Sequence, residues 1–544
     1  MVYLRSKRTE TMPTDCIPFR ETNYFSSLIC DYLDENDDLK SFYNRFPTLE
    51  NFKAQITEKE RSFSLETRKV LVDSLKAQYA AVDISEATQY NIESLSEGTT
   101  FTITTGHQLN LFTGPLYFFY KIISTINLCT QLQAKYPKHH FVPVYWMATE
   151  DHDFEEINYF NFKGRKVQWP REASGAVGEL GLEGLDVVFE VFSQQLNTST
   201  NAKTLKHLFH AAYLKHENLA DAMRFLVNSL FKDYGLVILD GNDAALKRLF
   251  LPFVKNDIVD QVAFNKVTEA NSQLNSLKGN YKIQVNPRAI NMFYITKGIR
   301  ERIVKTEDTY TVLNTSTSWN ETELLQELDA YPERFSPNVI MRPLFQEVIL
   351  PNLCYIGGGG ELAYWLQLQS NFEAQGVVFP MLLLRNSVVI VTQKQEDKLS
   401  KLKVPINDLF LKQNDLRTKI TKQISDIDID FSTQKAHLES QFEALYAIAE
   451  QTDPSFLGAV KAQEIKQIKG LDHLESRLLK AQKRQCSDHL ERITALQNIL
   501  FPGQSLQERN MNFSEFYLEY GADFVPKLIA NLKPLEGVFT VLTI

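Results

Sequence analysis

The spacing of apolar residues predicts that the first part of the chain is helical. Between residues 20 and 95, apolar side chains recur at helical spacing, as in Tyr24, Leu28 and Tyr32. Strong helix formers fill the stretch from Glu66 to Tyr79. We therefore expect several helices before the first strand.

A strand–helix–strand unit follows these helices and completes a predicted first region over 1–162. Residues 101–105 are a short β-branched run, and Gly106 ends it. A helix is expected from about Pro115 to about Lys135, because proline suits the first helical turn. Residues 141–147 are then the next strand. A βαβ unit has parallel strands, so a doubly wound sheet is expected.

The pattern is less regular over 163–335, which we interpret as an inserted, connecting α/β region. A strand is expected at 234–240, a helix at 248–262 and hairpin strands at 285–303, where apolar residues alternate. The glycine-rich piece 175–184 is interpreted as a surface loop rather than a phosphate cradle.

The chain is expected to return to the main sheet in a second core region, 336–395. This return is placed at 342–355 and is followed by four glycines, Glu361 and a helix over about 362–372. Further strands are expected at 377–384 and 388–392.

Long helices are predicted over 396–500, where prolines are rare and apolar residues recur three and four positions apart. With Asp453-Pro454 as a break, two antiparallel helices forming a coiled coil are the simplest interpretation. Residues 501–544 regain aromatic residues and are expected to pack on the core.

Composition and charge narrow the class of protein. The chain has 544 residues and a net charge of −9, without a long basic run, so a nucleic-acid partner is not expected. Its five cysteines are far apart and form no C-x-x-C, which fits a reducing cytoplasm. Residues 1–20 lack the apolar core of a signal peptide, and the most apolar run, 377–384, is too short for a membrane span.

The first polar cluster lies where the first predicted strand meets its helix. Gly106 frees the backbone, and a helix N-terminus favours a phosphate or carboxylate. Lys121 would lie about two turns further along. The motif is neither G-x-G-x-x-G nor a P-loop, so an ordinary turn capped by Thr113 stays the alternative. The expected substrate-binding residues here are Gly106, His107, Gln108, Asn110, Thr113 and Lys121.

The second cluster, 150–156, places five acids and one histidine directly after the second strand. Such a cluster can bind a metal, orient an amine or supply a general base, with the histidine polarised by a carboxylate. The alternative is an acidic N-cap of the next helix. The expected catalytic residues are Glu150, Asp151 and His152, and the expected substrate contacts are Asp153 and Asn158.

The glycine run 357–360 and Glu361 form a third cluster. Glycines let the backbone approach a ligand closely, and Glu361 can accept hydrogen bonds from an amine or hydroxyl; a flexible connection is the alternative. Arg342 and Arg385 lie near other strand ends, where each could clamp a carboxylate or pair with an internal acid. The further substrate-binding residues expected here are Gly358 and Tyr364.

A metallohydrolase combining His107, Asp151 and His152 is disfavoured, because the chain lacks the tight ligand spacing of H-x-x-x-H. No metal site is predicted.

Four segments together resemble a known family. Residues 105–121 resemble T-G-Q-Q…L-F-T-G-P-L-Y…Y-K, and 146–158 resemble W-x-x-x-E-D-H-D-F-x-E-I-N. Residues 342–364 resemble R-P…Y-[IV]-G-G-x-x-E-x-A-Y, and 506–509 match L-Q-E-R. The family is the cysteine-adding enzyme of bacillithiol synthesis. His107 departs from it, because the family usually has glutamine there.

The resemblance implies an α/β fold with a Rossmann-like parallel-sheet core, inserted connecting domains and a long C-terminal helical coiled coil that supports a homodimer. It implies a cytoplasmic ligase that joins the carboxyl group of cysteine to the amine of glucosaminyl malate. ATP or another nucleotide would be the ordinary source of activation, because amide formation from a free carboxylate is uphill in water.

The implied substrates suggest roles for the three clusters. The carboxylates of glucosaminyl malate suit the helix N-terminus with Arg342 or Arg385. An ammonium group suits Glu150, Asp151 or Glu361, and His152 is the candidate for taking the proton of the attacking amine.

Two other functions stay open. The chain could be a non-catalytic coiled-coil scaffold with a vestigial nucleotide fold, or a nucleotidyl transferase acting on another small molecule. Polar clusters at several strand ends disfavour the scaffold, which has no need of them.

Overall fold

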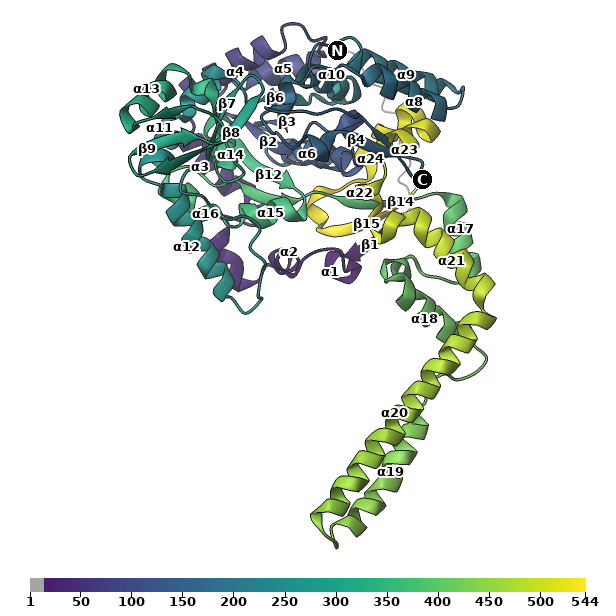
Figure 1. Ribbon diagram of the computed structural model, residues 1–544. Coiled ribbons are helices and arrows are strands. Elements are labelled where there is room, and N and C mark those ends of the chain that lie inside the picture. Colours follow the sequence, from purple (N-terminus) through teal and green to yellow (C-terminus); the bar gives the residue numbers. More distant parts are fainter. Residues whose placement is uncertain (1–13) are drawn as a thin grey trace. The chain divides into compact units, whose positions relative to one another are not determined.

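The computed structural model describes residues 14–544 (Figure 1). The start of the stretch considered above for a signal peptide, residues 1–13, lies outside the described residues. The chain forms two compact units. The first runs to Val389 and includes Gln507–Leu542, and the second comprises Ile390–Leu506 with Thr543–Ile544.

A five-stranded parallel sheet, in the order β13-β12-β2-β3-β6, forms the centre of the first unit. This confirms the predicted α/β, Rossmann-like core. Because the strands are parallel, their carboxyl ends meet at one edge of the sheet, where ligands bind in such folds. The strands are β2 (Thr100–His107), β3 (His140–Met147), β6 (Val237–Asp240), β12 (Asn352–Gly357) and β13 (Met381–Leu384).

The central strands are buried on both faces. Every residue of β2 is buried, and Phe101, Ile103 and Ile356 belong to one hydrophobic cluster. The helix α6 (Tyr117–Lys135) packs on β2 and β3 and begins two residues after Pro115. Burial on both faces explains why these strands appear in the sequence as apolar runs without alternation.

The predicted amino-terminal helices are confirmed. Ser64 and Ser85 cap two of them by accepting hydrogen bonds from backbone N–H groups. Before these helices, β1 (Thr14–Pro18) pairs antiparallel with β15 (Val538–Thr543). The helices are α1 (Phe19–Thr22), α2 (Ser27–Leu33), α3 (Phe52–Ser62), α4 (Leu65–Gln78) and α5 (Glu86–Ser94).

The inserted region 163–335 adds helices and a second, antiparallel sheet in the order β10-β9-β8-β7-β11. The predicted hairpin is present as β7 (Met292–Thr296) and β8 (Ile299–Thr306). The other strands are β4 (Tyr159–Phe162), β5 (Arg165–Gln168), β9 (Thr309–Val312), β10 (Ser318–Trp319) and β11 (Phe335–Pro337). The helices are α7 (Phe154–Ile157), α8 (Leu185–Gln195), α9 (Thr200–Tyr213), α10 (Leu219–Phe231), α11 (Ala244–Val259), α12 (Val262–Ser276) and α13 (Glu321–Ala330).

The glycine-rich piece 175–184 is not simply a surface loop, and that expectation is wrong in part. Val177 and Gly178 are buried, and their N–H groups donate to the carbonyls of Asp151 (2.7 Å) and Thr149 (2.8 Å). A Cβ at Gly178 would lie 2.7 Å from that of Thr149. Glycine is therefore required for this segment to hold the acidic loop after β3.

The return to the main sheet differs from the expectation of a strand beginning at residue 342. Residues Met341–Ile349 form helix α14, and only Asn352–Gly357 form the strand β12. The helix expected over about 362–372 is two shorter helices, α15 (Gly359–Trp365) and α16 (Gln369–Ala374). An apolar run such as 377–384 predicts burial but not the strand start, which is at Met381 in β13.

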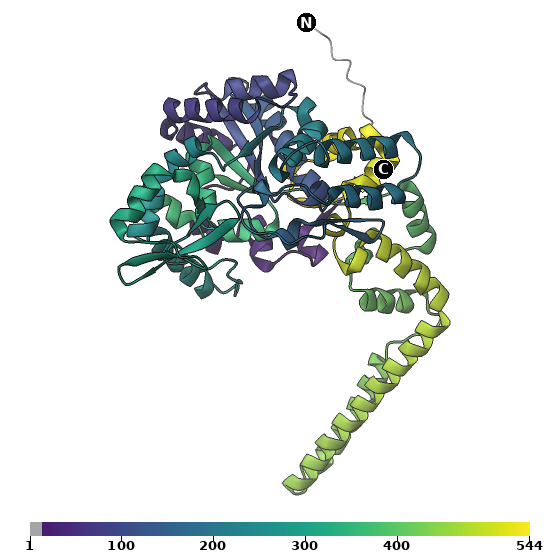
Figure 2. The same ribbon diagram turned by 45° about the horizontal axis from the view of Figure 1, so that its top comes forward.

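The second unit contains the predicted antiparallel hairpin, with Asp453 capping the second helix and Pro454 beginning it. α19 (Ser432–Ala449) and α20 (Pro454–Gln485) run side by side in both views (Figures 1 and 2). Shorter helices replace the rest of the predicted pair: α17 (Gln393–Leu402), α18 (Gln413–Ile424) and α21 (Ser487–Leu500).

The carboxyl-terminal segment of the first unit packs on the core. Phe513 stacks on Phe119 of α6, with ring centroids 4.7 Å apart. The helices of this segment are α22 (Gln507–Asn510), α23 (Phe513–Tyr520) and α24 (Phe524–Asn531). The strand β14 (Ser387–Val391) lies earlier in the chain, where the first unit ends and the second begins.

Candidate active site

Three of the predicted polar clusters follow neighbouring strands of the parallel sheet. β2 ends at His107, β3 ends at Met147, and β12 ends at Gly357. β2 is hydrogen-bonded to both of the others. Residues far apart in the sequence therefore lie at one edge of one sheet.

An ion pair between Lys121 and Glu361 links two of these strand ends. The Lys121 ammonium lies 2.6 Å from Oε2 of Glu361 and donates to the Gly106 carbonyl at 2.7 Å. Glu361 also accepts hydrogen bonds from the Tyr355 hydroxyl (2.7 Å) and the Gly358 N–H (2.8 Å). The Lys121 side chain is 4% exposed and that of Glu361 is 25% exposed, so only the carboxylate reaches the surface.

The environment keeps the Glu361 carboxylate ionised. Burial acts to raise the pKa of Glu361, but the Lys121 charge and the Gly358 N–H outweigh it, so the pKa is lowered. Burial lowers the pKa of Lys121, and Glu361 opposes that shift. A partly exposed carboxylate of this kind can accept hydrogen bonds from an ammonium or hydroxyl group of a substrate.

Arg342 brings an unused donor to the same place. It lies on α14 rather than on a strand, and its Nη1 donates to Gln346 at 3.0 Å. Its buried Nη2 has no hydrogen-bond acceptor among residues 14–544. A Cβ at Gly106 would lie 3.2 Å from the Tyr355 hydroxyl and 3.9 Å from Nη1 of Arg342, so glycine leaves room there.

Arg385 is occupied by an internal acid, which was one of the two alternatives. Its Nη2 donates to Glu508 at 2.7 Å, and both side chains are almost fully buried. Nη1 donates to the Asn386 carbonyl and the Ser387 hydroxyl. Only Nε, near Gly358, has no acceptor in the described part of the chain. Arg385 therefore ties the carboxyl-terminal segment to the sheet.

His107 is buried and neutral. Burial, with the charges of Lys121 and Arg385, lowers its pKa well below the ordinary value. Its Nε2 has no hydrogen-bond partner among the described residues, and its ring lies against Tyr117 and Phe118.

The N-terminus of α6 offers fewer free N–H groups to an anion than expected, because backbone carbonyls accept three of the N–H groups there. Leu116 donates to Met511 (2.8 Å), Phe118 to Pro115 and Phe119 to Leu116. Thr113 is not a cap either: its hydroxyl is buried without a partner in the described segment, and its φ is +68°.

The loop after β3 is held by the loop after β2. Nε2 of Gln108 donates to Asp151 (2.9 Å) and to Glu156 (2.8 Å). Asn110 donates to the carbonyl of Glu156 at 2.9 Å. The Asp151 carboxylate also accepts the N–H of His152 at 2.7 Å. Gln108 and Asn110 therefore position the acidic loop.

Other acidic-loop residues have structural contacts. Lys247 lies 2.6 Å from Glu150, and the side chains are 3% and 12% exposed. Asn158 is buried and bonds to Glu155 and Gln168. Asp153 is exposed and does not cap α7 through its side chain. Of the three expected catalytic residues, Asp151 and His152 are thus the two that combine exposure with hydrogen bonds to the surrounding loop.

The inserted sheet contributes a residue that the sequence interpretation missed. Nη1 of Arg300, on β8, lies 2.6 Å from Nδ1 of His152, and the guanidinium lies over the ring of Phe293 at 4.0 Å. The His152 side chain is 49% exposed. The alternating pattern of 285–303 predicted the hairpin, but no local signal showed that it reaches the acidic loop.

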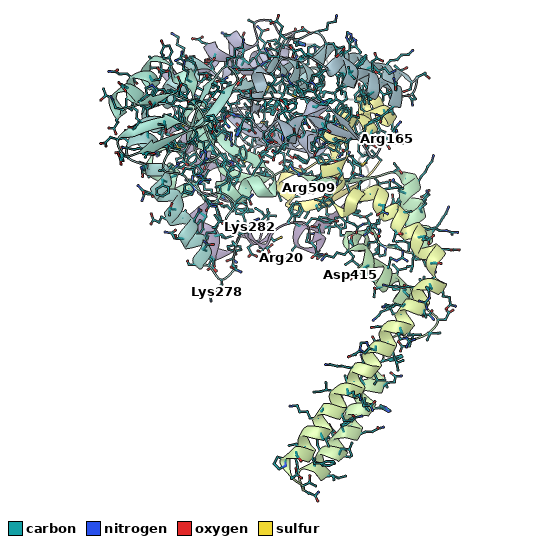
Figure 3. The ribbon with its side chains drawn as sticks, viewed as in Figure 1. Arg20, Arg165, Lys278, Lys282, Asp415 and Arg509 are labelled. Atoms are coloured by element: carbon teal, nitrogen blue, oxygen red, sulfur yellow. The ribbon has the colours of Figure 1, made fainter. Side chains whose placement is uncertain are left out.

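The carboxyl-terminal segment also reaches the first loop. Asn512 donates to the carbonyls of Phe112 (2.8 Å) and Gly114 (2.6 Å). A small cavity of about 30 Å³ is lined by residues that include Asn110, Glu156 and the exposed Arg509 labelled in Figure 3. The aromatic residues of 501–544 predicted packing on the core, and the L-Q-E-R match lies just before Asn512, but neither signal predicted the contact with the first loop.

Among residues 14–544, no group of three or more His, Cys, Asp or Glu side chains could hold a metal ion. Within the same residues, every helix is too short or too polar to cross a membrane.

The fold and the site define an α/β protein with a Rossmann-like sheet, a polar cluster at its carboxyl edge and an appended helical hairpin. The chain belongs to the bacillithiol biosynthesis BshC family. Its residues 12–386 match the model of the N-terminal Rossmann-like domain of that family, and 388–544 match the C-terminal coiled-coil domain. The predicted family is thereby confirmed.

Curated relatives match over nearly the whole chain. A protein of Flavobacterium johnsoniae named "Putative cysteine ligase BshC" is 58% identical over 98% of this chain and 100% of its own. One of Christiangramia forsetii with the same name is 58% identical over 98% of this chain and 99% of its own. Of solved structures, an arginyl-tRNA synthetase of Plasmodium falciparum is 10% identical, covers 80% of this chain and 77% of its own, and has a TM-score of 0.22. That score is too low to support a structural conclusion.

Proposed function

We propose that this protein is an amide-forming ligase that joins the carboxyl group of cysteine to the amine of glucosaminyl malate, the last step of bacillithiol synthesis. The observation that carries the proposal is the 58% identity, over nearly the full length, to proteins named cysteine ligase. The polar groups at the edge of the sheet support it, because they match the charges of these substrates.

The contacts already made within the protein reduce the number of candidate substrate contacts. Glu150 and Arg385 are paired internally, whereas Nη2 of Arg342 is a buried donor without an acceptor in the described residues. We assign Arg342 to a carboxylate of glucosaminyl malate and Glu361 with Asp151 to ammonium groups. His152, which is half exposed, is assigned to the reacting carboxyl group.

The proposed reaction includes ATP or another nucleotide, which would supply the free energy to activate the cysteine carboxyl group. The buried donor of Arg342 suits an anionic oxygen of either a phosphate or a carboxylate. Lys121 is less suited to bind such an anionic oxygen, because its ammonium group already contacts Glu361 and the Gly106 carbonyl.

The direct test mixes the purified protein with cysteine and glucosaminyl malate, with and without ATP, and detects bacillithiol by mass spectrometry. Product is expected in the arm with ATP. Absence of product from both arms would contradict the proposal. Asp151→Asn and His152→Ala should abolish product while leaving the melting temperature almost unchanged, and His207→Ala, an exposed histidine on α9, is the matched control.

We further propose that the protein is a cytoplasmic homodimer associated through the α19–α20 hairpin. The hairpin has a small core of its own, formed by Phe442, Ala449 and Val460. Large apolar side chains remain exposed on it, including Ile448 and Ile465. Five free cysteines suit a reducing compartment.

A further inference from the structure

The β7–β8 hairpin brings Arg300 against a histidine 148 positions earlier in the chain. A guanidinium group has only N–H donors, so in the contact between Arg300 and His152 the imidazole Nδ1 must be the acceptor. A neutral imidazole with a bare Nδ1 carries its hydrogen on Nε2. The 2.6 Å contact therefore selects one tautomer of His152.

Arg300 is itself fixed on three sides. Its Nε donates to the buried Ser336 hydroxyl at 3.1 Å, and its Nη2 donates to the Pro337 carbonyl at 3.3 Å. The face of its guanidinium lies over the ring of Phe293. With Nε and Nη2 held by β11 and the face held by β7, Nη1 is directed at His152 and cannot turn away without losing these contacts.

Among residues 14–544, Asp151, from the same loop, is the other charged contact of the ring, and its Oδ1 lies 3.8 Å from Nδ1 of His152. Nη1 of Arg300 is closer to the same nitrogen, at 2.6 Å. The closer contact therefore determines which ring nitrogen is the acceptor.

We propose that Arg300 is a positioning residue that holds His152 as the neutral tautomer with hydrogen on Nε2, so that His152 donates a hydrogen bond to an oxygen of the reacting carboxyl group. Nε2 makes no hydrogen bond within the described residues, and the side chain is half exposed. A donor placed there stabilises negative charge as it develops on that oxygen. His152 neither gains nor loses a proton in this role.

This assignment replaces the expectation that His152 takes the proton of the attacking amine. The only lone pair of the neutral ring lies in the ring plane at Nδ1 and is occupied by Arg300. The kinetic part of the assignment rests on the proposed ligase function, whereas the tautomer does not.

The tautomer is tested without turnover, by long-range proton–nitrogen NMR on the full chain labelled with ¹⁵N-histidine. The His152 signals are assigned by their loss in His152→Gln. In the neutral ring we expect the hydrogen on Nε2 and a bare Nδ1. In Arg300→Met, the neutral ring should populate both tautomers, so that part of the hydrogen appears on Nδ1. Arg302→Met, an exposed arginine two residues along the same strand, should behave like the wild type. A wild-type signal with hydrogen on Nδ1 would overturn the proposal.

The donor role is tested by turnover in the ligase assay. Glutamine can place an N–H near the position of Nε2, so His152→Gln should keep kcat within about tenfold of the wild type, whereas His152→Ala should lose about a hundredfold or more. A glutamine variant as inactive as the alanine variant would overturn the donor role. A wild-type protein without turnover would instead contradict the ligase function and leave the NMR result standing.

Discussion

At Lys121, burial and charge pairing act in opposite directions on one ammonium group. Burial favours the neutral amine, and Glu361 favours the charged form. Glu361 stays partly exposed, so the pair offers a substrate its carboxylate while hiding its cation. Lys121 therefore supports the proposed substrate contact indirectly, by holding the Glu361 carboxylate in place and ionised.

Glu361→Gln is expected to lower both stability and turnover. The substitution leaves a buried ammonium without its counter-charge, which costs about 3 kcal/mol of the free energy of unfolding. It also removes the proposed substrate contact, so turnover should fall about a hundredfold. Urea unfolding and the ligase assay measure the two effects.

The control is Asp408→Asn, which breaks the pair of Asp408 and Lys419 in the second unit, where none of the proposed substrate contacts lies. It should lose stability and keep its turnover when folded. Lys121→Met combined with Glu361→Gln should recover stability but not activity, because replacing both partners leaves no unpaired charge. A turnover loss at Asp408 as large as that at Glu361 would mean that stability alone explains the effect.

Asp257 gives the inserted region a pH-dependent contribution to stability. It is fully buried, accepts two hydrogen bonds from Asn291, and burial raises its pKa to about 6. The folded pKa lies above the unfolded value, so the contribution is complete below about pH 4 and is lost as pH rises through 6, by about 3 kcal/mol. Urea unfolding measures the free energy of unfolding at about pH 5 and at about pH 7.5. The decrease between these two pH values should be smaller in Asp257→Asn than in the wild type. Equal decreases would contradict the assignment.

At the scale of elements, the turn between β2 and α6 is held in a backbone conformation that it would not adopt alone. Phe112, Thr113 and Gly114 have φ values of +48°, +68° and +61°, and two of them are not glycine. The hydroxyl of Tyr213 accepts the Phe112 N–H, and Asn512 donates to two carbonyls of the turn. The turn that carries Gln108 and Asn110 is thus shaped by residues distant in the sequence.

Asn512→Ala is expected to release this turn. It leaves two buried carbonyls without their donor, at a cost of about 2 kcal/mol. Because Gln108 and Asn110 would then hold the acidic loop less firmly, KM should rise more than kcat falls. Asn51→Ala, which removes a hydrogen bond to the carbonyl of Phe46 before α3, is the control. If Asn512→Ala loses the expected 2 kcal/mol or so of stability and its KM is unchanged, the turn does not position the site.

The sequence predicted those elements whose signal is local. The apolar runs of β2 and β3, the βαβ order and the break at Asp453-Pro454 all depend on neighbouring residues, and the structure confirms them. The partners of Arg385 and His152 depend on residues 123 and 148 positions away, which no local pattern encodes. The alternation over 285–303 predicted a hairpin because it is a local signal. A local signal does not show which distant segment the hairpin contacts, so the contact with His152 was not predicted.

At the scale of the whole molecule, every candidate site residue lies in the first unit, and the α19–α20 pair of the second unit carries several exposed large apolar side chains. Both halves match the same family, which extends over 12–386 and 388–544. The proposed catalysis therefore belongs to the first unit and the proposed association to the hairpin, which carries none of the expected site residues.

Charged substitutions on α20 should therefore abolish the proposed dimer without unfolding the chain. Ile465 and Leu474 are 46% and 54% exposed, and nine residues of helix place them on opposite flanks of the face that packs on α19. Ile465→Glu with Leu474→Glu puts charge on both flanks and should give a monomer in sedimentation velocity, with a melting temperature close to that of the wild type. Lys203→Glu, an exposed lysine on α9 of the first unit, should stay dimeric. A wild-type protein that sediments as a monomer at micromolar concentration would exclude association through the hairpin, whereas a double variant that stays dimeric would place the interface elsewhere.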